Sequence, residues 1–376
     1  MRIKSFKYKN TKGYNKQWEI EKFQLNDINL IVGQNATGKT RIVESLKRLS
    51  EFICGKTLKS EGKESFELLL KEEDVVYSYL LEINSNMVSK EKLEEIKEGK
   101  KIRLLIRDEN GEGKIYSLKD EKDIEFGIQA NQMAIVYKND KIHHNFIEKI
   151  VEWAEKTIFY SFATPLGRYN YCLVKESEED YSLKETDKVV KNYIKAKQKY
   201  EILDEKIESD LKKINYVIEN IGVEKGTNNQ GEVRVLFVKE RDLKGKTYQF
   251  EMSQGMFRAL SIIIQLNICI LDNRGELIVI DDIGEGLDYE RSSELIKLIV
   301  EKTKESKAQV IMTTNDRFVM NNIDLDYWQV IRRDAGNIKL YNKNNSKEVF
   351  EEFQYTGLNN FEFLSRKLYL GEDDEE

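Results

Sequence analysis

Near the N-terminus the chain reads Gly33-Gln34-Asn35-Ala36-Thr37-Gly38-Lys39-Thr40. This stretch fits the pattern G-x-x-x-x-G-K-[ST], the phosphate loop of nucleotide-binding proteins. The apolar run at 28–32 predicts a buried strand before the loop, and apolar residues at helical spacing from Ile42 to Ile53 predict a helix after it. Strand, glycine loop and helix are the context that the pattern needs. They favour nucleotide binding over a glycine turn with an incidental lysine.

Each residue type in this loop suits the binding of a triphosphate. Gly33 and Gly38 let the backbone turn and expose its N–H groups without a Cβ in the way. These groups and the start of the following helix form an anion site. Lys39 adds a positive charge at the phosphates, and Thr40 offers a hydroxyl to Mg²⁺. We therefore expect the nucleotide to be bound by Gly33, Asn35, Ala36, Thr37, Gly38, Lys39, Thr40 and Arg41.

The composition is that of a globular protein with a heavily charged surface. The chain has 376 residues, of which 40% are apolar and 34% are charged, and its formal net charge is −6. This length is enough for a large core and for two or three lobes. The net negative charge gives the protein as a whole no electrostatic attraction to nucleic acid. A local basic strip on its surface is the alternative.

The remaining global signals favour a reducing cytoplasm. Cys54, Cys172 and Cys269 are isolated and odd in number, so we expect free or buried thiols. The N-terminus has no apolar signal region, and no apolar run approaches the roughly eighteen residues of a membrane span. We expect a cytoplasmic protein without a membrane partner.

Apolar periodicity divides the chain into three predicted parts. A strand-rich lobe at 66–140 lies within the first part, and its antiparallel strands are joined by charged turns. In this lobe we expect a short helix at 90–96 and a strand at 133–137. From residue 253 helices and strands alternate, which predicts parallel strands with crossover helices and hence an α/β fold. The three predicted parts are residues 1–175, 176–226 and 227–376.

The middle part, residues 176–226, is predicted to be a helical insertion of two helices. Lysines and glutamates fill the positions between its apolar residues, so we expect a solvated charged face, with direct DNA contact by the lysines as the alternative. A loop at 225–231 and strands at 233–239 and 248–252 are expected to follow. The acidic end at 371–376 is expected to be disordered.

A second group of functional residues follows an apolar strand predicted at 277–280. The strand runs directly into Asp281-Asp282. Asp281 is expected to hold Mg²⁺ together with Thr40, and Asp282 to orient or deprotonate the attacking water. An acidic pair at the end of a strand is a weak signal alone, but a strong one in a chain that also carries a phosphate loop.

Three further stretches resemble motifs of the ABC-type ATPases. Residues 281–288 resemble the Walker B motif and the D-loop of that family, residues 252–256 resemble its signature loop, and residues 313–316 stand at the place of its switch loop. The resemblance covers residues 1–60 and 230–320 well and the middle poorly. The N-terminal strands and the inserted section make the chain most similar to the RecF, SMC and OLD branch.

This resemblance implies a P-loop ABC-type ATPase fold with an N-terminal antiparallel β lobe and a helical insertion. It also implies that two copies close head to tail around ATP, as a homodimer or within a higher oligomer. Ser253 and Gly255 of one copy would then contact the γ-phosphate bound by the other copy. Asp288 would lie at the seam between the copies.

Two residues depart from the family pattern. Asp282 stands where the family usually has glutamate, and its shorter side chain leads us to expect slow hydrolysis. Asn315 stands at the switch position that is usually histidine, so it can hydrogen-bond a phosphate oxygen but cannot carry a proton. The glutamine that contacts Mg²⁺ in this family has two candidates here, Gln129 and Gln132.

Three polar features are weighed between a structural and a catalytic role. Arg258 is expected to anchor a helix terminus, and Arg317 to pair with Asp316, with a catalytic role as the alternative for either. The adjacent pair His143-His144 is expected to lie in a surface loop.

Three functions compete for this chain. The leading one is an ATP-dependent switch that controls a separately encoded effector, because no effector motif follows residue 320 and such ATPases resemble the sensor subunits of bacterial anti-phage systems. The second is a DNA-binding ATPase of repair or maintenance, similar to RecF and SMC. The third is an importer ATPase, which the strand-rich section and the helical insertion disfavour.

Overall fold

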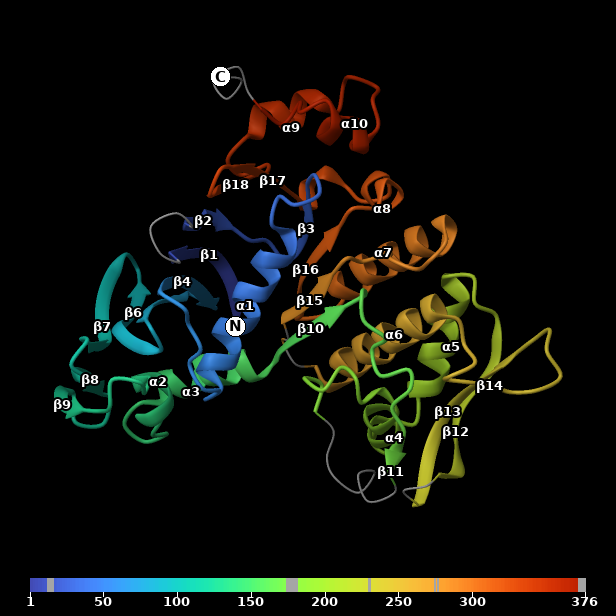
Figure 1. The fold of residues 1–376 in the computed structure, drawn as a ribbon, viewed down its shortest axis with the longest axis horizontal. Coiled ribbons are helices and arrows are strands. Elements are labelled where there is room, and N and C mark those ends of the chain that lie inside the picture. Colours follow the sequence, from blue (N-terminus) through green and yellow to red (C-terminus); the bar gives the residue numbers. More distant parts are fainter. Residues whose placement is uncertain (12–16, 174–181, 229–230, 274, 276, 371–376) are drawn as a thin grey trace. The chain divides into compact units, whose positions relative to one another are not determined.

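The computed structural model describes residues 1–11, 17–173, 182–228, 231–273, 275 and 277–370 (Figure 1). The acidic end at 371–376 lies outside the described residues. The chain packs into two compact units, each with its own core. Unit 1 comprises residues 1–157, 326–357 and 366–376, and unit 2 comprises residues 158–325 and 358–365. The domain boundaries predicted at residues 175 and 226 follow sequence motifs and stay a prediction.

Unit 1 is organised around a mixed sheet. The predicted strand β3 (Ile28–Val32) is buried along its whole length and pairs in parallel with β17 (Trp328–Asp334). From there the order of strands is β3-β17-β18-β2-β1-β4-β5-β6-β7-β8-β9. The others are β18 (Asn337–Tyr341), β2 (Gln17–Gln24), β1 (Arg2–Thr11), β4 (Lys63–Glu72), β5 (Val75–Asn84), β6 (Met87–Lys97), β7 (Lys100–Arg107), β8 (Glu112–Ser117) and β9 (Lys122–Gly127).

The predicted antiparallel lobe is present and continues this sheet. Strands β4 to β9 form successive antiparallel pairs, and the β7–β8 turn contains the predicted Asn110-Gly111. Along β5 every second residue is buried, which is the pattern of a strand with one covered face. The helices of unit 1 are α1 (Lys39–Ile53), α2 (Ala134–Tyr137), α3 (Asn145–Glu155) and α9 (Lys347–Phe353).

Two elements of the lobe differ from the sequence prediction, and one buried carboxylate connects them. Residues 90–96, predicted to be a helix, lie in β6, where Glu91 is fully buried. Residues 133–137, predicted to be a strand, contain α2, whose first turn donates to Glu91 from Ala134 N at 2.6 Å and from Ile135 N at 3.0 Å. Burial raises the pKa of Glu91. A carboxylate at a helix N-terminus thus holds a helix too short to form alone.

Unit 2 contains the predicted alternation of helices and strands. Strand β15 (Leu277–Asp281) pairs in parallel with β16 (Gln309–Thr314), and both are buried along their length. Helices α5 (Leu203–Lys213), α6 (Gln254–Asp272) and α7 (Tyr289–Lys304) pack against one another (Figure 1). The remaining elements are β10 (Thr157–Ser161), β11 (Cys172–Leu173), α4 (Val189–Lys199), β12 (Ile218–Asn228), β13 (Gly231–Glu240), β14 (Thr247–Tyr248), α8 (Arg317–Asn321) and α10 (Asn360–Ser365).

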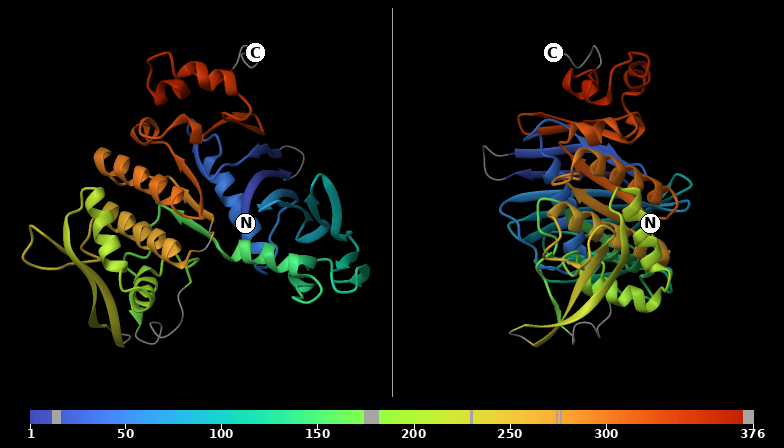
Figure 2. Two further views of the ribbon diagram at one scale, coloured as in Figure 1. Left: turned by 180° about the vertical axis from the view of Figure 1, so that it is seen from behind. Right: turned by 90° about the vertical axis from the view of Figure 1, so that its right-hand side faces the viewer.

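The helical insertion has the two predicted helices, α4 and α5, followed by a long antiparallel hairpin of β12 and β13 (Figure 2). Residues 225–228, predicted to be a loop, belong to β12. The strand predicted at 248–252 ends at Tyr248, because the side chain of the buried Gln249 forms hydrogen bonds with backbone groups in place of a strand backbone. Its Oε1 accepts from Leu236 N at 3.0 Å, and its Nε2 donates to Asn170 O at 2.9 Å.

Helix α6 is the one element of the described residues that is long and apolar enough to cross a membrane by length and composition. Its 19 residues include a window of mean hydropathy 1.5, and 83% of that window is buried inside the protein. The sequence predicted no apolar run that approaches a membrane span, although it indicated an apolar helix at 258–271. Its burial against α5 and α7 makes it the central helix of unit 2.

Candidate functional site

The phosphate loop in unit 1 has the backbone that the glycine pattern predicts. Gly38 caps α1 in the left-handed region, with φ of 107°, and Ala36 also has a positive φ of 63°. A Cβ on Gly38 would lie 2.4 Å from Trp18 Cζ2, and a Cβ on Gly33 would lie 2.4 Å from Ile331 Cγ2. Both positions therefore need glycine for space, and Gly38 needs it for conformation as well.

Bonds within the loop hold its lysine in place. Lys39 is buried, with 6% of its surface exposed, and its Nζ donates to Gly33 O at 2.9 Å and Gln34 O at 3.0 Å. Thr37 Oγ1 also donates to Gln34 O, at 2.8 Å. The first N–H groups of α1 have no partner within the helix, so an anion at this N-terminus would meet both these donors and a fixed ammonium.

Two residues that the sequence analysis did not propose lie beside this loop. The indole ring of Trp18 is covered by the Arg41 guanidinium at 4.1 Å and the Arg333 guanidinium at 4.6 Å. Arg333 Nη1 also donates to Ala36 O at 3.2 Å. These three side chains line a cavity of about 870 Å³ together with Tyr8, Asn10, Gln17, Glu44, Ser45, Arg48, Ala335 and Gly336.

The predicted acidic pair in unit 2 is fixed by one threonine hydroxyl. Asp281, the last residue of β15, is 7% exposed, and its Oδ1 accepts from Thr313 Oγ1 at 2.6 Å. The same hydroxyl oxygen accepts from Asp282 N at 2.9 Å. Thr313 is at the end of the neighbouring parallel strand β16, so the strand pairing itself positions both aspartates.

The two residues predicted to be catalytic, Asp282 and Asn315, lie together. Asn315 Nδ2 donates to Asp282 Oδ1 at 3.5 Å, and Asn315 is exposed while Asp282 is half-buried. Asp282 has a positive φ of 56°. Aspartate and asparagine tolerate this left-handed conformation better than most residues, and such strain is concentrated at functional sites. The geometry is suited to holding a water molecule at the end of β15.

The signature loop and the D-loop interlock within unit 2. Ser253 caps α6, and its Oγ accepts from Met256 N at 3.1 Å. A Cβ on Gly255 would lie 2.4 Å from Gly286 O, and a Cβ on Gly286, whose φ is 80°, would lie 2.5 Å from Arg258 Nη1. Both loops therefore need glycine where they meet.

Arg258 forms hydrogen bonds at this junction. Of the two roles considered for it, these contacts support the structural one. Arg258 is 3% exposed, and it donates from Nη1 to Glu285 O at 2.8 Å and from Nε to Thr164 O at 3.3 Å. Burial lowers the pKa of its guanidinium. Because these donors are committed to backbone carbonyls of the D-loop and of the segment after β10, Arg258 supports the site.

Asp288 and Asp316 each cap a helix. Asp288 is exposed, and its carboxylate accepts from Arg291 N at 3.0 Å and pairs with Arg291 Nη1 at 2.6 Å. The backbone N–H of Arg291, followed by its guanidinium, lowers the pKa of Asp288. Asp316 Oδ1 accepts from Phe318 N at 2.7 Å, and the Arg317 guanidinium lies over the Phe318 ring at 4.7 Å.

The two glutamine candidates do not reach the phosphate loop, so that prediction is wrong. Gln129 and Gln132 line a cavity of about 410 Å³ with Phe52 and Gly55, at the C-terminal end of α1. The phosphate loop is at the other end of this 15-residue helix, which is about 22 Å long. Neither side chain can contact a cation held by Thr40.

The histidine pair precedes α3 in a turn, as predicted, but only His143 lies at the surface. His143 Nδ1 bonds to Asp140 Oδ2 at 2.7 Å in a partly exposed position. His144 is 8% exposed at the start of α3, and burial lowers the pKa of its imidazole.

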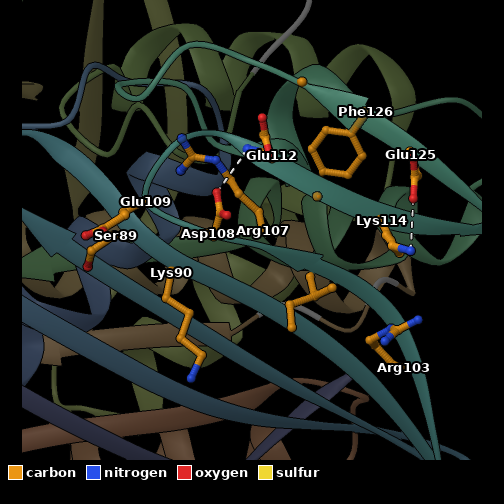
Figure 3. Close-up of a pocket in the computed structure, with 13 residues that line it drawn as sticks. Ser89, Lys90, Arg103, Arg107, Asp108, Glu109, Glu112, Lys114, Glu125 and Phe126 are labelled. Atoms are coloured by element: carbon orange, nitrogen blue, oxygen red, sulfur yellow. Dashed lines mark hydrogen bonds and ion pairs between the residues drawn. The ribbon is translucent and has the colours of Figure 1, made fainter.

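A further cavity, of about 990 Å³, lies among strands β6 to β9 (Figure 3). Some of its lining charges form ion pairs: Lys114 pairs with Glu125 at 2.9 Å, and Arg103 pairs with Asp123. The buried Arg107 at its wall donates to Gln129 O and Ala130 O, both at 3.1 Å. These contacts hold the segment between β9 and α2, and the cavity is far along the sheet from the phosphate loop.

The residues present fit a magnesium–nucleotide complex. Two glycine positions leave no room for a Cβ, a buried lysine spans the loop, and a buried carboxylate stands at a strand end. Among the described residues no group of three or more histidine, cysteine, aspartate or glutamate side chains could hold a metal ion. Thr40 in unit 1 and Asp281 in unit 2 each offer an oxygen of the kind that Mg²⁺ prefers, and phosphate oxygens are the usual further ligands of this ion.

Comparison with known families and sequences gives two matches. A family model described as "AAA domain, putative AbiEii toxin, Type IV TA system" matches residues 28–321, more than three quarters of the chain. A "Putative ABC transporter ATP-binding protein" from Methanosarcina acetivorans is 30% identical over 126 residues, which is 33% of this chain and 22% of that protein. The chain thus matches about a fifth of that relative's length.

Comparison with solved structures gives heads of SMC proteins. One is an Smc head bound to the C-terminal winged-helix domain of ScpA, with a TM-score of 0.54, 14% identity, and coverage of 90% of this chain and 97% of that chain. Another is an Smc head with an extended coiled coil bound to the C-terminal domain of ScpA from Pyrococcus furiosus, with a TM-score of 0.50, 13% identity, and coverage of 94% and 99%. This likeness confirms the predicted α/β fold.

Proposed function

The chain belongs to the family described as "AAA domain, putative AbiEii toxin, Type IV TA system", and from that premise we propose that it is an ABC-type ATPase of which two copies close head to tail around ATP and hydrolyse it. In this proposal each copy supplies a phosphate loop to one nucleotide and a signature loop and D-loop to the other. Binding of ATP favours the closed pair by the difference in its affinity for the two states, and hydrolysis releases the pair.

The observation that carries this proposal is that two helix-capping side chains are exposed beside buried, closely packed residues. Ser253 and Asp288 are exposed, while Gly255 and Arg258 beneath them are buried and interlocked with the D-loop. The N-terminus of a helix favours anions, and Ser253 opens the 19-residue helix α6. A rigid, exposed anion-favouring surface is what the second half of a shared nucleotide site requires.

The chemistry is divided among five residues. Lys39 neutralises charge on the phosphates, and Thr40 and Asp281 would hold Mg²⁺, which supplies further charge neutralisation. Asp282 accepts a proton from, or orients, the attacking water. Asn315 donates to Asp282 and keeps its carboxylate aimed at that water. Since aspartate is shorter than the glutamate usual in the family, we expect slow turnover.

The test is Asp282→Asn, because asparagine keeps the size and tolerates the left-handed backbone at this position. We expect ATP binding to remain, turnover to fall by about a hundredfold, and a dimer to accumulate with ATP in light scattering. Asp242→Asn, an exposed aspartate between β13 and β14, is the matched control. Turnover at the parent rate would refute the role of Asp282, and a mass that never responds to ATP would refute the closed pair.

For the biological role we propose a cytoplasmic switch that controls a separately encoded effector in defence against phage. This proposal draws on the matching family's description, which names a "putative AbiEii toxin" and a "Type IV TA system". Capture of a partner by the Asp282→Asn protein with ATP, and not by Lys39→Ala, would support the role. A partner that binds both variants equally would contradict control by the nucleotide.

The alternative is a DNA-binding ATPase, supported by the likeness to SMC heads. It predicts affinity for duplex DNA that falls steeply with salt, because lysines and arginines on phosphates release counterions. Binding of DNA by the ATP-bound pair, without capture of a protein partner, would favour this alternative over the effector switch.

A further inference from the structure

Three neighbouring strands of unit 2 end at the predicted acidic pair, and each contributes a side chain that carries oxygen. The order of these strands is β10-β15-β16 (Figure 1). Ser161 is the last residue of β10, and Asp281 is the last residue of β15. Thr313 lies one residue before the end of β16. The carboxyl ends of strands are where open α/β sheets bind their ligands.

The backbone places Ser161 directly beside Asp281. Phe162 N donates to Asp281 O at 3.0 Å, at the point where both strands end. Because both strands reach this bond with their C-terminal ends, they run in parallel, and their last residues lie opposite each other. Opposite residues of neighbouring strands are about 4.8 Å apart and direct their side chains to the same face of the sheet.

Two side-chain contacts define this face. Tyr160 OH donates to Gln265 Oε1 of α6 at 2.8 Å. Since successive side chains of a strand alternate, Ser161 points to the face opposite α6. On the other side of β15, Thr313 Oγ1 donates to Asp281 Oδ1 at 2.6 Å. Ser161, Asp281 and Thr313 therefore form one row across the three strand ends.

Two oxygens of this row are available to a ligand. Asp281 is 7% exposed, and only its Oδ1 is bonded to Thr313. The half-buried Ser161 uses its carbonyl, which accepts from Thr164 N at 3.1 Å and from Thr164 Oγ1 at 2.8 Å. Within the part of the chain that the structure describes, neither Asp281 Oδ2 nor Ser161 Oγ has a hydrogen-bond partner. A buried carboxylate oxygen without a partner costs free energy that a bound cation would offset.

The chemistry of these two oxygens suits a small divalent cation. Thr313 Oγ1 donates to Asp281 and also accepts from Asp282 N at 2.9 Å, so its role is to position the carboxylate. Mg²⁺ and Mn²⁺ prefer oxygen ligands, and Mg²⁺ commonly combines one or two protein groups with waters and phosphate oxygens. The carboxylate disfavours an anion at the same place, because like charges repel.

We propose that the Ser161 hydroxyl is a ligand of the divalent cation that Asp281 binds together with the nucleotide. This inference rests on the proposed function and adds a residue of β10 to its metal site. Ser161 contributes an oxygen without a charge, so it leaves the positive charge of the cation to the carboxylate and the phosphates. Waters and phosphate oxygens supply the remaining ligands.

The experiment follows Mn²⁺ binding by electron paramagnetic resonance in protein saturated with a non-hydrolysable ATP analogue, so the result does not depend on turnover. Ser161→Ala should weaken Mn²⁺ binding about tenfold, the lower end of the loss for groups that support a metal site. Ser161→Thr keeps a hydroxyl and should bind Mn²⁺ as wild type does. An unchanged Mn²⁺ affinity of the alanine variant would overturn the proposal.

Ser261→Ala is the matched control. The Ser261 hydroxyl is buried in the same unit and donates to Phe257 O at 2.7 Å within α6, so its removal deletes a serine hydroxyl away from the strand ends. This variant should bind Mn²⁺ with the affinity of wild type. A loss equal to that of Ser161→Ala would show that the effect comes from a general change in unit 2, and it would contradict the role of Ser161.

A change of metal preference tests direct ligation. Ser161→Cys replaces a hard oxygen by sulfur, which prefers softer ions. Cd²⁺ should displace Mn²⁺ from this variant at a concentration about tenfold lower than from wild type. If the cysteine variant kept the metal preference of wild type, the side chain at position 161 would not contact the ion, and the proposal would be wrong.

The same titration with Asp281→Asn distinguishes this inference from the proposed function. If Asp281→Asn weakens Mn²⁺ binding and Ser161→Ala does not, only the role of Ser161 fails. If neither variant loses affinity, the cation does not bind at the end of β15, and the metal site of the proposed function fails as well. If wild type binds no analogue at all, the proposed function itself is refuted.

Discussion

The phosphate loop and the signature surface differ in how much of each is finished within one copy of the chain. The loop is enclosed by its own unit: Lys39 is 6% exposed, and Gly33 and Gly38 are packed against Ile331 and Trp18. On the signature surface the supports are buried, but the capping side chains Ser253 and Asp288 are exposed. The phosphate loop is thus formed within unit 1, whereas the signature surface of unit 2 leaves its two capping side chains exposed.

The strongest test of this difference is a variant that lacks the positive charge of Lys39 in the phosphate loop. Lys39→Ala should weaken ATP binding by about a hundredfold or more, because contacts to a charged donor contribute about 1.5–3 kcal/mol each. The measurement is calorimetric titration with ATP. Lys47→Ala, an exposed lysine on the same helix, should bind as wild type does. Unchanged affinity in the Lys39 variant would show that the nucleotide binds elsewhere.

Crowding the loop should have the next largest effect. Gly38→Ala adds a Cβ 2.4 Å from Trp18 at a φ of 107°, so we expect about 2–3 kcal/mol lower stability and weaker ATP binding. Gly99→Ala is matched in conformation, with a φ of 77°, but has open space around the new Cβ. It should lose only about 1 kcal/mol. Equal melting temperatures for the two variants would mean that Trp18 does not enclose the loop.

Substitution of Ser253, on the exposed signature surface, should have the opposite balance of effects. The free energy of unfolding should change little, and turnover should change more. Ser253→Ala removes the cap of α6 and should lower stability by about 1 kcal/mol, which is roughly 2 °C in a chain of this size. Ser253→Asn restores a capping oxygen and should recover the melting temperature. Turnover should stay low in both variants, because neither side chain has a hydroxyl; recovery with asparagine would leave Ser253 a purely structural cap.

The smallest effect concerns the pH dependence of the Asp288 cap. The pKa of Asp288 is lowered by the Arg291 backbone N–H, so its contribution is present above the unfolded pKa of about 4 and is lost as the pH falls through the folded value. The side chain is exposed, which limits the contribution to a few tenths of a kcal/mol. In melting curves from pH 7 to pH 2, the difference between wild type and Asp288→Asn should vanish at the acidic end.

Most of the correct fold prediction came from local sequence motifs. The phosphate loop and the strands that end at Asp281 and near Asn315 depend on a few consecutive residues, and the sequence predicted them as strand ends and turns. The resemblance to the ABC-type ATPases implied that Asp282 and Asn315, 33 residues apart, serve one site, and Asn315 Nδ2 lies 3.5 Å from Asp282 Oδ1.

The missed features depend on contacts between distant residues. Strand β6 reads as a helix because it is rich in lysine and glutamate, yet pairing with β5 and β7 overrides this propensity. Arg333 reaches Ala36 across 297 residues, and no pattern around either residue indicates that contact. The glutamine candidates failed for the same reason, since only the fold shows which end of α1 they approach.

The close approach of Gly255 to Gly286 has a consequence for how this protein can diverge. A methyl group on either glycine would push the signature loop and the D-loop apart, and Arg258 is bonded to the same junction. We therefore expect a change in one loop to be tolerated only with a compensating change in the other. A hybrid assembled from two diverged relatives would have to exchange both loops together to remain functional.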